Sequence, residues 1–278
     1  MTTNRNYFRN SKILPVDKFI DNVLFDKKIG YYSSKMPFGS SGDFITSPNI
    51  SNLFSEIIGI WLISTWGALG KPKKFNLVEL GPGDGSLTKV LLKTFQNFPE
   101  FNSSTNIYLY ERSNFLINLQ KKNIDNPKVK WITNFKNIKK GPIIFLGNEF
   151  FDAIPIKQFF WKGTFLLEKY YMLNKRNKIN EVYKKASAKS ISRIEKFKTL
   201  KKLRFIEFPK LGLDELKKII KKISKLSGGL LLIDYGYLKP NNKNTLQSVI
   251  KHKKNNMLNN LGKADITSLV NFKLLEEY

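Results

Sequence analysis

The chain contains no cysteine and a single histidine, His252, among its 278 residues. Disulfides, thiolate metal sites and cysteine nucleophiles are therefore excluded, and zinc sites or hydrolytic triads built on histidine are disfavoured. We accordingly expect no metal site. The longest apolar run, Ile57–Ile63, is far shorter than the ~20 residues that cross a bilayer, so no membrane insertion is expected.

The N-terminal residues Met1–Asn10 are polar and lack the apolar core of a signal peptide. Together with the absence of cysteine, this predicts a soluble protein in a reducing compartment. The lack of a presequence favours a bacterial cytoplasm, with the mitochondrial matrix as the alternative.

Arginine is scarce although the formal net charge is +26, because 42 of the 48 basic residues are lysine. Arginine is the residue best suited to planar contacts with phosphates and bases. A lysine-, asparagine- and isoleucine-rich composition is also what an AT-rich genome imposes on exposed positions. We therefore expect no specific nucleic-acid partner, while weak binding to polyanions at low salt is expected in either case.

The most informative segment joins a short apolar run, Phe75–Leu80, to a helix-like stretch through a turn that contains Gly81, Gly83 and Gly85. A strand, a glycine turn and a helix open the nucleotide site of a doubly wound α/β domain. Glycines let the backbone bend where a Cβ atom would clash, so main-chain groups can approach a ligand. A glycine turn required only for steric reasons is the alternative interpretation.

The spacing of these glycines restricts which class of ligand the turn could bind. Dinucleotide sites have the pattern G-x-G-x-x-G, whereas this turn has G-x-G-x-G and continues with Ser86. Glu79 places a carboxylate just before the turn, which suits an ammonium or sulfonium group better than a pyrophosphate. S-adenosylmethionine carries both cations and no phosphate, so it is the predicted cofactor.

A second acid supports this prediction. The segment Asn106–Tyr110 alternates like a β-strand and is followed by Glu111, 26 residues after Gly85. An acid that ends the second strand is placed to accept hydrogen bonds from a ribose. A solvated glutamate at the end of a strand is the alternative.

From Phe75 onward, strand-like and helix-like segments alternate, which predicts a doubly wound (Rossmann-like) α/β fold with a parallel sheet. We expect an N-terminal helical or lid region over residues 1–70 and the main domain over 71–278, with a β-rich insertion at about 156–210. A helix is predicted over Ile50–Trp66, capped by Ser47 or Asn49. Strands are predicted at 75–80, 106–111, 128–132, 142–147, 159–161, 165–173 and 204–208, with a further buried strand at 228–236 that ends in an acid and a glycine, and helices are predicted at 15–25, 86–97, 113–121 and 213–226. The polar tail, 239–278, gives no clear assignment.

Two further segments hold candidate site residues. In the loop Gly39–Pro48, glycines and small hydroxyls suit a segment that folds over a ligand. Asp43 in this loop could orient a cation, and a capped loop that enters the next helix is the alternative.

The second segment, Gly147–Pro155, follows the fourth strand of the predicted sheet, at the edge of the ligand crevice. It clusters Asn148, Glu149 and Asp152. Its two carboxylates could clamp a guanidinium. The alternative is capping of a helix by Asn148, with ordinary acids in the first turn. Asp234, which follows a later strand, is a further residue that could border the crevice.

Four segments together resemble the MidA-like family, which includes mitochondrial complex I assembly factor 7 and bacterial relatives: GDFITSP (42–48), VELGPGDG (78–85), NEFFDAIP (148–155) and LLIDYGY…TLQSV…ADITSLVNF (231–272). The resemblance implies a class I S-adenosylmethionine-dependent methyltransferase. In its mitochondrial members it implies arginine methylation of a protein substrate that is a complex I subunit. It also makes Gly42, Thr46 and Pro48 candidate cofactor contacts.

Two features depart from the family pattern. Asp84 stands where relatives usually carry arginine, and the family continues beyond the segment where this chain ends, so the C-terminal part is short for the family. Two other functions stay open. One is an RNA methyltransferase, which Glu149 disfavours because it stands where a base-stacking motif is expected. The other is a non-catalytic assembly protein that keeps the fold with a degenerate pocket.

Overall fold

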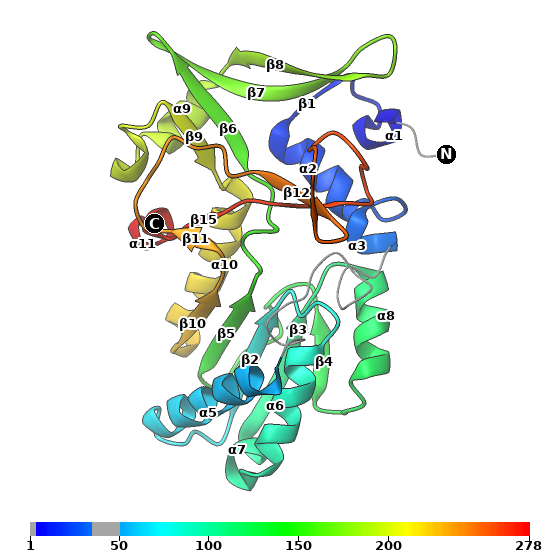
Figure 1. Ribbon diagram of the computed structural model, residues 1–278. Helices are drawn as coiled ribbons and strands as arrows, with labels where there is room; N and C mark the ends of the chain where they lie inside the picture. The colour runs from blue at the N-terminus through cyan, green and yellow to red at the C-terminus, as the bar shows by residue number, and fades with distance from the viewer. Residues whose placement is uncertain (1–3, 35–50) are drawn as a thin grey trace. The chain divides into compact units, whose positions relative to one another are not determined.

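The computed structural model describes residues 4–34 and 51–278 (Figure 1). The chain forms two compact units. Unit 1 contains Met1–Lys35, Phe151–Glu215 and Asp234–Tyr278, and unit 2 contains Met36–Phe150 and Leu216–Ile233.

Unit 2 contains a parallel five-stranded sheet with the order β10-β5-β2-β3-β4. The glycine turn follows β2, the central strand, whose six residues are all buried. The five strands predicted in this unit are confirmed. The ends of four of them shift by one residue at most, whereas β10 ends at Ile233 rather than Gly236 and is partly exposed rather than buried. The five strands are β2 (Phe75–Leu80), β3 (Thr105–Tyr110), β4 (Val129–Ile132), β5 (Ile143–Asn148) and β10 (Gly228–Ile233).

Helices cover both faces of this sheet, as the doubly wound prediction requires. Figure 1 shows α5 and α6 side by side over one face, where Leu62 and Leu91 pack with Leu77 of β2 in one core cluster. On the other face, Ile219 of α10 packs in a second cluster with Val78 of β2. The helices are α5 (Asn52–Ala68), α6 (Ser86–Gln96), α7 (Pro99–Ser104), α8 (Asn114–Asn123) and α10 (Lys210–Leu226), which belongs to unit 2 from Leu216.

The predicted cap of α5 is wrong. The helix begins at Asn52, and its N-cap is Ser51, whose hydroxyl accepts a hydrogen bond from the Leu53 N–H at 3.1 Å. Serine, threonine and asparagine are all good N-caps, so the sequence offered several candidates within a few residues of one another.

Unit 1 is built on an antiparallel sheet of order β1-β7-β6-β9, with β8 paired to β7. Phe19 of α2 packs against Tyr171 of β7 with ring centroids 4.7 Å apart. The strands are β1 (Ile13–Pro15), β6 (Lys157–Lys162), β7 (Phe165–Leu173), β8 (Ile179–Lys185) and β9 (Phe205–Phe208). The helices are α1 (Asn4–Phe8), α2 (Val16–Phe25), α3 (Tyr31–Ser34) and α9 (Ala188–Ile194), with the 3-10 helix η1 (Lys198–Leu200).

The tail that the sequence left unassigned is largely ordered into short elements. A small antiparallel sheet has the order β13-β12-β14, and β11 pairs with β15 in parallel. These elements are β11 (Gly236–Tyr237), β12 (Gln247–Ile250), β13 (Lys253–Asn255), β14 (Asp265–Thr267), β15 (Val270–Asn271) and α11 (Phe272–Glu277).

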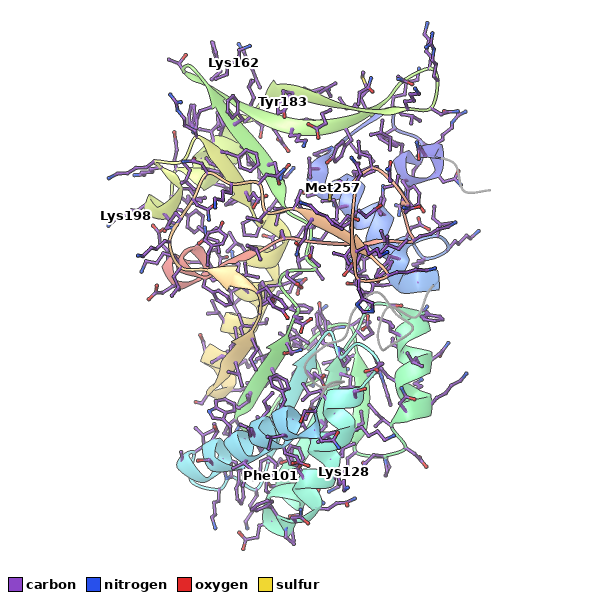
Figure 2. The ribbon with its side chains drawn as sticks, in the orientation of Figure 1. Phe101, Lys128, Lys162, Tyr183, Lys198 and Met257 are labelled. Atoms are coloured by element: carbon purple, nitrogen blue, oxygen red, sulfur yellow. The ribbon has the colours of Figure 1, made fainter. Side chains whose placement is uncertain are left out.

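Exposed lysines occur in both units, and Figure 2 labels three of them, Lys128, Lys162 and Lys198. By contrast, Phe101 of α7 is fully buried. No helix in residues 4–34 and 51–278 is long and apolar enough to span a membrane.

Candidate functional site

Three neighbouring strands of unit 2 end at the same level. In the sheet register, Leu80 of β2 lies opposite Tyr110 of β3 on one side and Gly147 of β5 on the other. The residues that follow these positions are Gly81, Glu111 and Asn148, all of which the sequence marked as site residues. The carboxyl edge of the parallel sheet therefore brings the glycine turn, the acid after β3 and the end of β5 together, where α/β folds bind ligands.

The turn after β2 has the backbone that its glycines predict. Gly81, Gly83 and Gly85 have φ angles of 60°, 58° and 86°, in the left-handed region that side chains with a Cβ atom rarely adopt. The Gly85 N–H donates to the carbonyl of Pro82 at 2.8 Å, and Gly85 is the N-cap of α6.

Two of the three glycines are also required by protein packing. A Cβ atom at Gly81 would lie 2.9 Å from the Phe150 ring, and one at Gly85 would lie 2.7 Å from the side chain of Ile124. Their presence is thus explained even without a ligand. Contact between the turn and a cofactor stays a prediction, and Gly83, in the middle of the turn, is the position at which to test it.

Glu79 lies within β2 and is almost completely buried, with an exposed fraction of 3%. Its carboxylate accepts a hydrogen bond from the Thr88 hydroxyl of α6. Burial raises the pKa of Glu79 to about 7; the Thr88 hydrogen bond opposes this rise and the nearby charge of Asp84 adds to it. The protein itself therefore supplies a partner for this carboxylate beneath the glycine turn, and its interaction with a cationic ligand stays a prediction.

Glu111 accepts hydrogen bonds from the backbone N–H groups of Arg112 and Ser113, both at 2.7 Å and both to Oε1. Burial raises its pKa, although these bonds and the one from Gln120 oppose the rise. Oε1 of Glu111 thus accepts hydrogen bonds from the two backbone N–H groups that precede α8. Binding of a ribose by Glu111 stays a prediction.

Gln120 of α8 is a residue that the sequence reasoning missed. Its Nε2 atom donates to the carbonyl of Gly83 at 2.8 Å and, at 3.4 Å, to Oε2 of Glu111. Its Oε1 atom accepts from the Trp131 indole at 2.9 Å. This fully buried amide therefore links the glycine turn to the acid after β3. The only signal in the sequence was a glutamine on the apolar side of a predicted helix.

The end of β5 carries two unusual features. The Oδ1 atom of Asn148 is buried, and it has no hydrogen-bond partner within the described part of the chain. A buried acceptor without a partner costs free energy, so its presence at this edge fits a group that a ligand satisfies. Glu149, the next residue, has a φ angle of 51°, and its N–H donates to the carbonyl of Ile233 at 2.8 Å. Such backbone strain in a residue other than glycine is concentrated at functional sites.

Asp152 and Asp234 lie in unit 1. Oδ2 of Asp234 accepts from the N–H groups of Phe151 and Asp152 at 2.9 and 3.2 Å, and its Oδ1 accepts from the Tyr235 N–H. Asp234 therefore fixes the backbone that presents Asp152. The sequence suggested that Asp234 could border the crevice, and this stays a prediction.

A hydrogen-bonded pair in unit 1, Tyr32 and Asp265, was also not predicted from the sequence. The Tyr32 hydroxyl donates to Oδ1 of Asp265 at 3.0 Å. Burial raises the pKa of Tyr32 well above its ordinary value, and the charges of Asp265 and Asp152 contribute. The carboxylate of Asp152 thus lies within electrostatic reach of this pair. The two partners are separated by 233 residues in the sequence.

Four predicted site residues, Gly42, Asp43, Thr46 and Pro48, lie outside the described residues. Of the others, Glu79, Glu111, Asn148, Glu149 and the three glycines of the turn belong to unit 2, and Asp152 belongs to unit 1. Within residues 4–34 and 51–278, no group of three or more histidine, cysteine, aspartate or glutamate side chains could hold a metal ion.

Comparison with known proteins identifies the family. Residues 57–278 match the family described as "Putative S-adenosyl-L-methionine-dependent methyltransferase". The chain belongs to this family. Three relatives, from Drosophila melanogaster, Caenorhabditis elegans and Homo sapiens, are named mitochondrial protein arginine methyltransferase NDUFAF7 or its homolog. They are 28%, 30% and 29% identical to this chain, over 94%, 96% and 94% of its length. The chain spans only 65% of the fly protein, 68% of the worm protein and 64% of the human protein.

Solved structures support the fold of this methyltransferase-family chain. A superfamily member from Burkholderia thailandensis, crystallised with S-adenosyl-homocysteine, superposes with a TM-score of 0.79 at 20% identity, covering 96% of this chain and 71% of that one. A native structure from the same organism gives a TM-score of 0.78. The doubly wound prediction is thereby confirmed for a chain of this family.

Proposed function

We propose that the chain binds S-adenosylmethionine at the carboxyl edge of β5, β2 and β3 and transfers its methyl group to an acceptor. The observation that carries the proposal is the alignment of Gly81, Glu111 and Asn148 at one level of that edge. The cofactor supplies an electrophilic methyl group on a sulfonium. The family description and the ligand in the structural neighbour support this choice.

The residues present fit such a ligand. The left-handed turn around Gly83 exposes backbone groups without side chains, and the buried Oδ1 of Asn148 offers an acceptor for an N–H donor. Oε2 of Glu111 accepts a long hydrogen bond from Gln120, at 3.4 Å, and a carboxylate oxygen has a second lone pair with which it can accept from a ribose hydroxyl. Methyl transfer requires alignment of donor and acceptor more than it requires acid–base chemistry.

We further propose that the acceptor is an arginine of a protein, as the names of the relatives suggest. A guanidinium stays protonated at neutral pH and is a poor nucleophile, so carboxylates are needed to orient it. Glu149, presented by a strained backbone, Asp152, held by Asp234, and Asp43 are the candidates. The resemblance to the MidA-like family supports a complex I subunit as the substrate, and the names of the relatives support the mitochondrial matrix as the setting.

Cofactor binding is tested at Gly83. We expect the Gly83→Val variant to lose most of its affinity for S-adenosylmethionine in calorimetric titration, because valine crowds the turn and resists a positive φ. Gly163→Val is the matched control, since Gly163 has the same φ of 58° and open space around its Cβ position in the β6–β7 turn. Equal affinity in the Gly83 variant and the wild type would contradict the proposed cofactor site. A wild type that binds no cofactor would favour a non-catalytic assembly protein.

The acceptor site is tested at Glu149. We expect Glu149→Gln to bind the cofactor normally and to lose most transfer of labelled methyl groups to proteins in a lysate, because the neutral amide cannot pair with a guanidinium. Glu195→Gln, at an exposed position of unit 1, is the control. Undiminished transfer would remove Glu149 from the mechanism, and labelling of RNA instead of protein would redirect the proposal to an RNA methyltransferase.

A further inference from the structure

Helix α5 is apolar on both of its sides. Its inner side packs in the core of unit 2 through Ile58, Leu62 and Trp66, which are at most 6% exposed. Its outer side presents large apolar side chains at helical spacing, with exposed fractions of 61% for Leu53, 60% for Ile57, 50% for Ile60 and 40% for Trp61. A helix that is apolar all round is typical of a buried position, which indicates that the outer side is covered in the working protein.

The distribution of charge along the chain restricts which kind of partner can cover the outer side of α5. Basic residues number 48 in the chain, yet none occurs between Lys35 and Lys71, where an even spread would place about six. Glu56 is the only charged residue of α5. An acidic partner would be expected to dock on lysines instead. Two copies of a chain with a net charge of +26 can meet closely only where lysines are absent.

The outer side is also complementary to itself. After the large residues of its first half, the same side of the helix continues with small exposed residues, Ser64, Gly67 and Ala68. Gly67 has open space around its Cβ position. An antiparallel pairing with its two-fold axis between Ile60 and Trp61 places Leu53 of one copy against Ala68 of the other, and Ile57 against Ser64. Large residues then fill the space above small ones, which permits an interaxial distance near the lower end of the ~8–10 Å range.

We propose that the outer side of α5 is the contact through which two copies of this chain form a symmetric dimer. The interface is isologous, with Ile60 next to the symmetry axis. The helix has 17 residues and is ~26 Å long, so two such helices bury less than the ~1,200 Å² of a standard interface. The dimer is therefore expected to be in concentration-dependent equilibrium with the monomer, in the micromolar range.

Sedimentation velocity over ~1–100 μM is the first test. The wild type is expected to shift from monomer to dimer within this range. In Ile60→Lys, two lysines face each other at the axis, and the dissociation constant is expected to rise at least ~10-fold. Leu238→Lys, a change at a 67% exposed leucine in unit 1, is the control and should dimerise like the wild type. A monomeric wild type at all concentrations, or an unchanged dimer in Ile60→Lys, would overturn the proposal.

The absence of cysteine allows a second, geometric test. Ile60→Cys places two thiols beside the axis, within reach of a disulfide, whose Cα atoms must lie within ~7 Å of each other. Leu53→Cys places them ~20 Å apart along the helix pair, because each faces Ala68. Mild oxidation should therefore cross-link the first variant and leave the second monomeric on a denaturing gel. Equal cross-linking of the two variants would exclude this pairing.

Discussion

Replacing Lys157 with methionine is expected to lower the free energy of unfolding by about 3–5 kcal/mol, the usual effect of removing one partner from a buried ion cluster. The Lys157 ammonium lies 3.1 Å from Oδ1 of Asp17 and 2.5 Å from Oε1 of Glu168. The three side chains are 15%, 3% and 6% exposed. Without the lysine, two carboxylates remain buried beside each other with no cation between them.

The pH dependence of this cluster has a defined sign. Burial alone would lower the pKa of Lys157, but the charges and hydrogen bonds of Asp17 and Glu168 outweigh it, and the pKa is raised. The stabilisation by Lys157 is therefore complete below the ordinary lysine pKa of 10.5 and is lost only as the pH rises through the higher folded-state value. Urea unfolding at pH 7 thus measures the full effect.

Lys169→Met is the matched control for this prediction. Lys169 belongs to the same sheet and its ammonium pairs with Oε1 of Glu181 at 2.6 Å, but the Glu181 side chain is 46% exposed. Water can solvate Glu181 after the change, so a loss of about 1 kcal/mol or less is expected from the ion pair. The triple variant Lys157→Met, Asp17→Asn, Glu168→Gln should recover much of the lost stability. A Lys157→Met effect no larger than that of Lys169→Met would contradict the argument.

The sheet of unit 2 could be predicted because its signals are local. A short apolar run that ends at a glycine turn identifies Phe75–Leu80 as a strand without reference to the rest of the chain. The rule that parallel strands align their carboxyl ends then places Gly81, Glu111 and Asn148 together, and the register confirms that alignment.

The contacts that were missed are tertiary. Gln120 is an ordinary helical residue until the fold brings Gly83 and Trp131 to its amide, and Asp234 reaches Phe151 across 83 residues of sequence. Strands β12 and β14 of the tail pair with each other across an irregular segment. Such short strands contain too few residues to show a clear alternation of apolar and polar side chains. Single-sequence patterns report burial and turns, but they do not report which distant backbone group a polar side chain will meet.

Replacing Glu79 with glutamine is expected to stabilise the protein by about 3 kcal/mol at pH 8 and to change its stability little at pH 4.5. The pKa of Glu79 is about 7 in the folded protein, against an ordinary value of 4.5, because burial disfavours the charged form. Between these values the folded state holds more protons than the unfolded state, so the stability of the wild type falls as the pH rises. Glutamine stays neutral and can still form a hydrogen bond with Thr88. The difference in free energy of unfolding between the variant and the wild type, measured with urea, should therefore increase from pH 4.5 to pH 8.

The same variant tests whether Glu79 acts on the cofactor. A cation bound near this carboxylate would favour its charged form and lower the pKa of Glu79, so by linkage the wild type should bind S-adenosylmethionine more tightly at pH 8 than at pH 6. In Glu79→Gln this part of the pH dependence should vanish. Asp84→Asn is the control, since Asp84 adds only the smallest contribution to the pKa of Glu79. If calorimetry gives wild type and Glu79→Gln the same pH profile, the buried carboxylate supports the glycine turn through Thr88 and has no contact with the cationic end of the ligand.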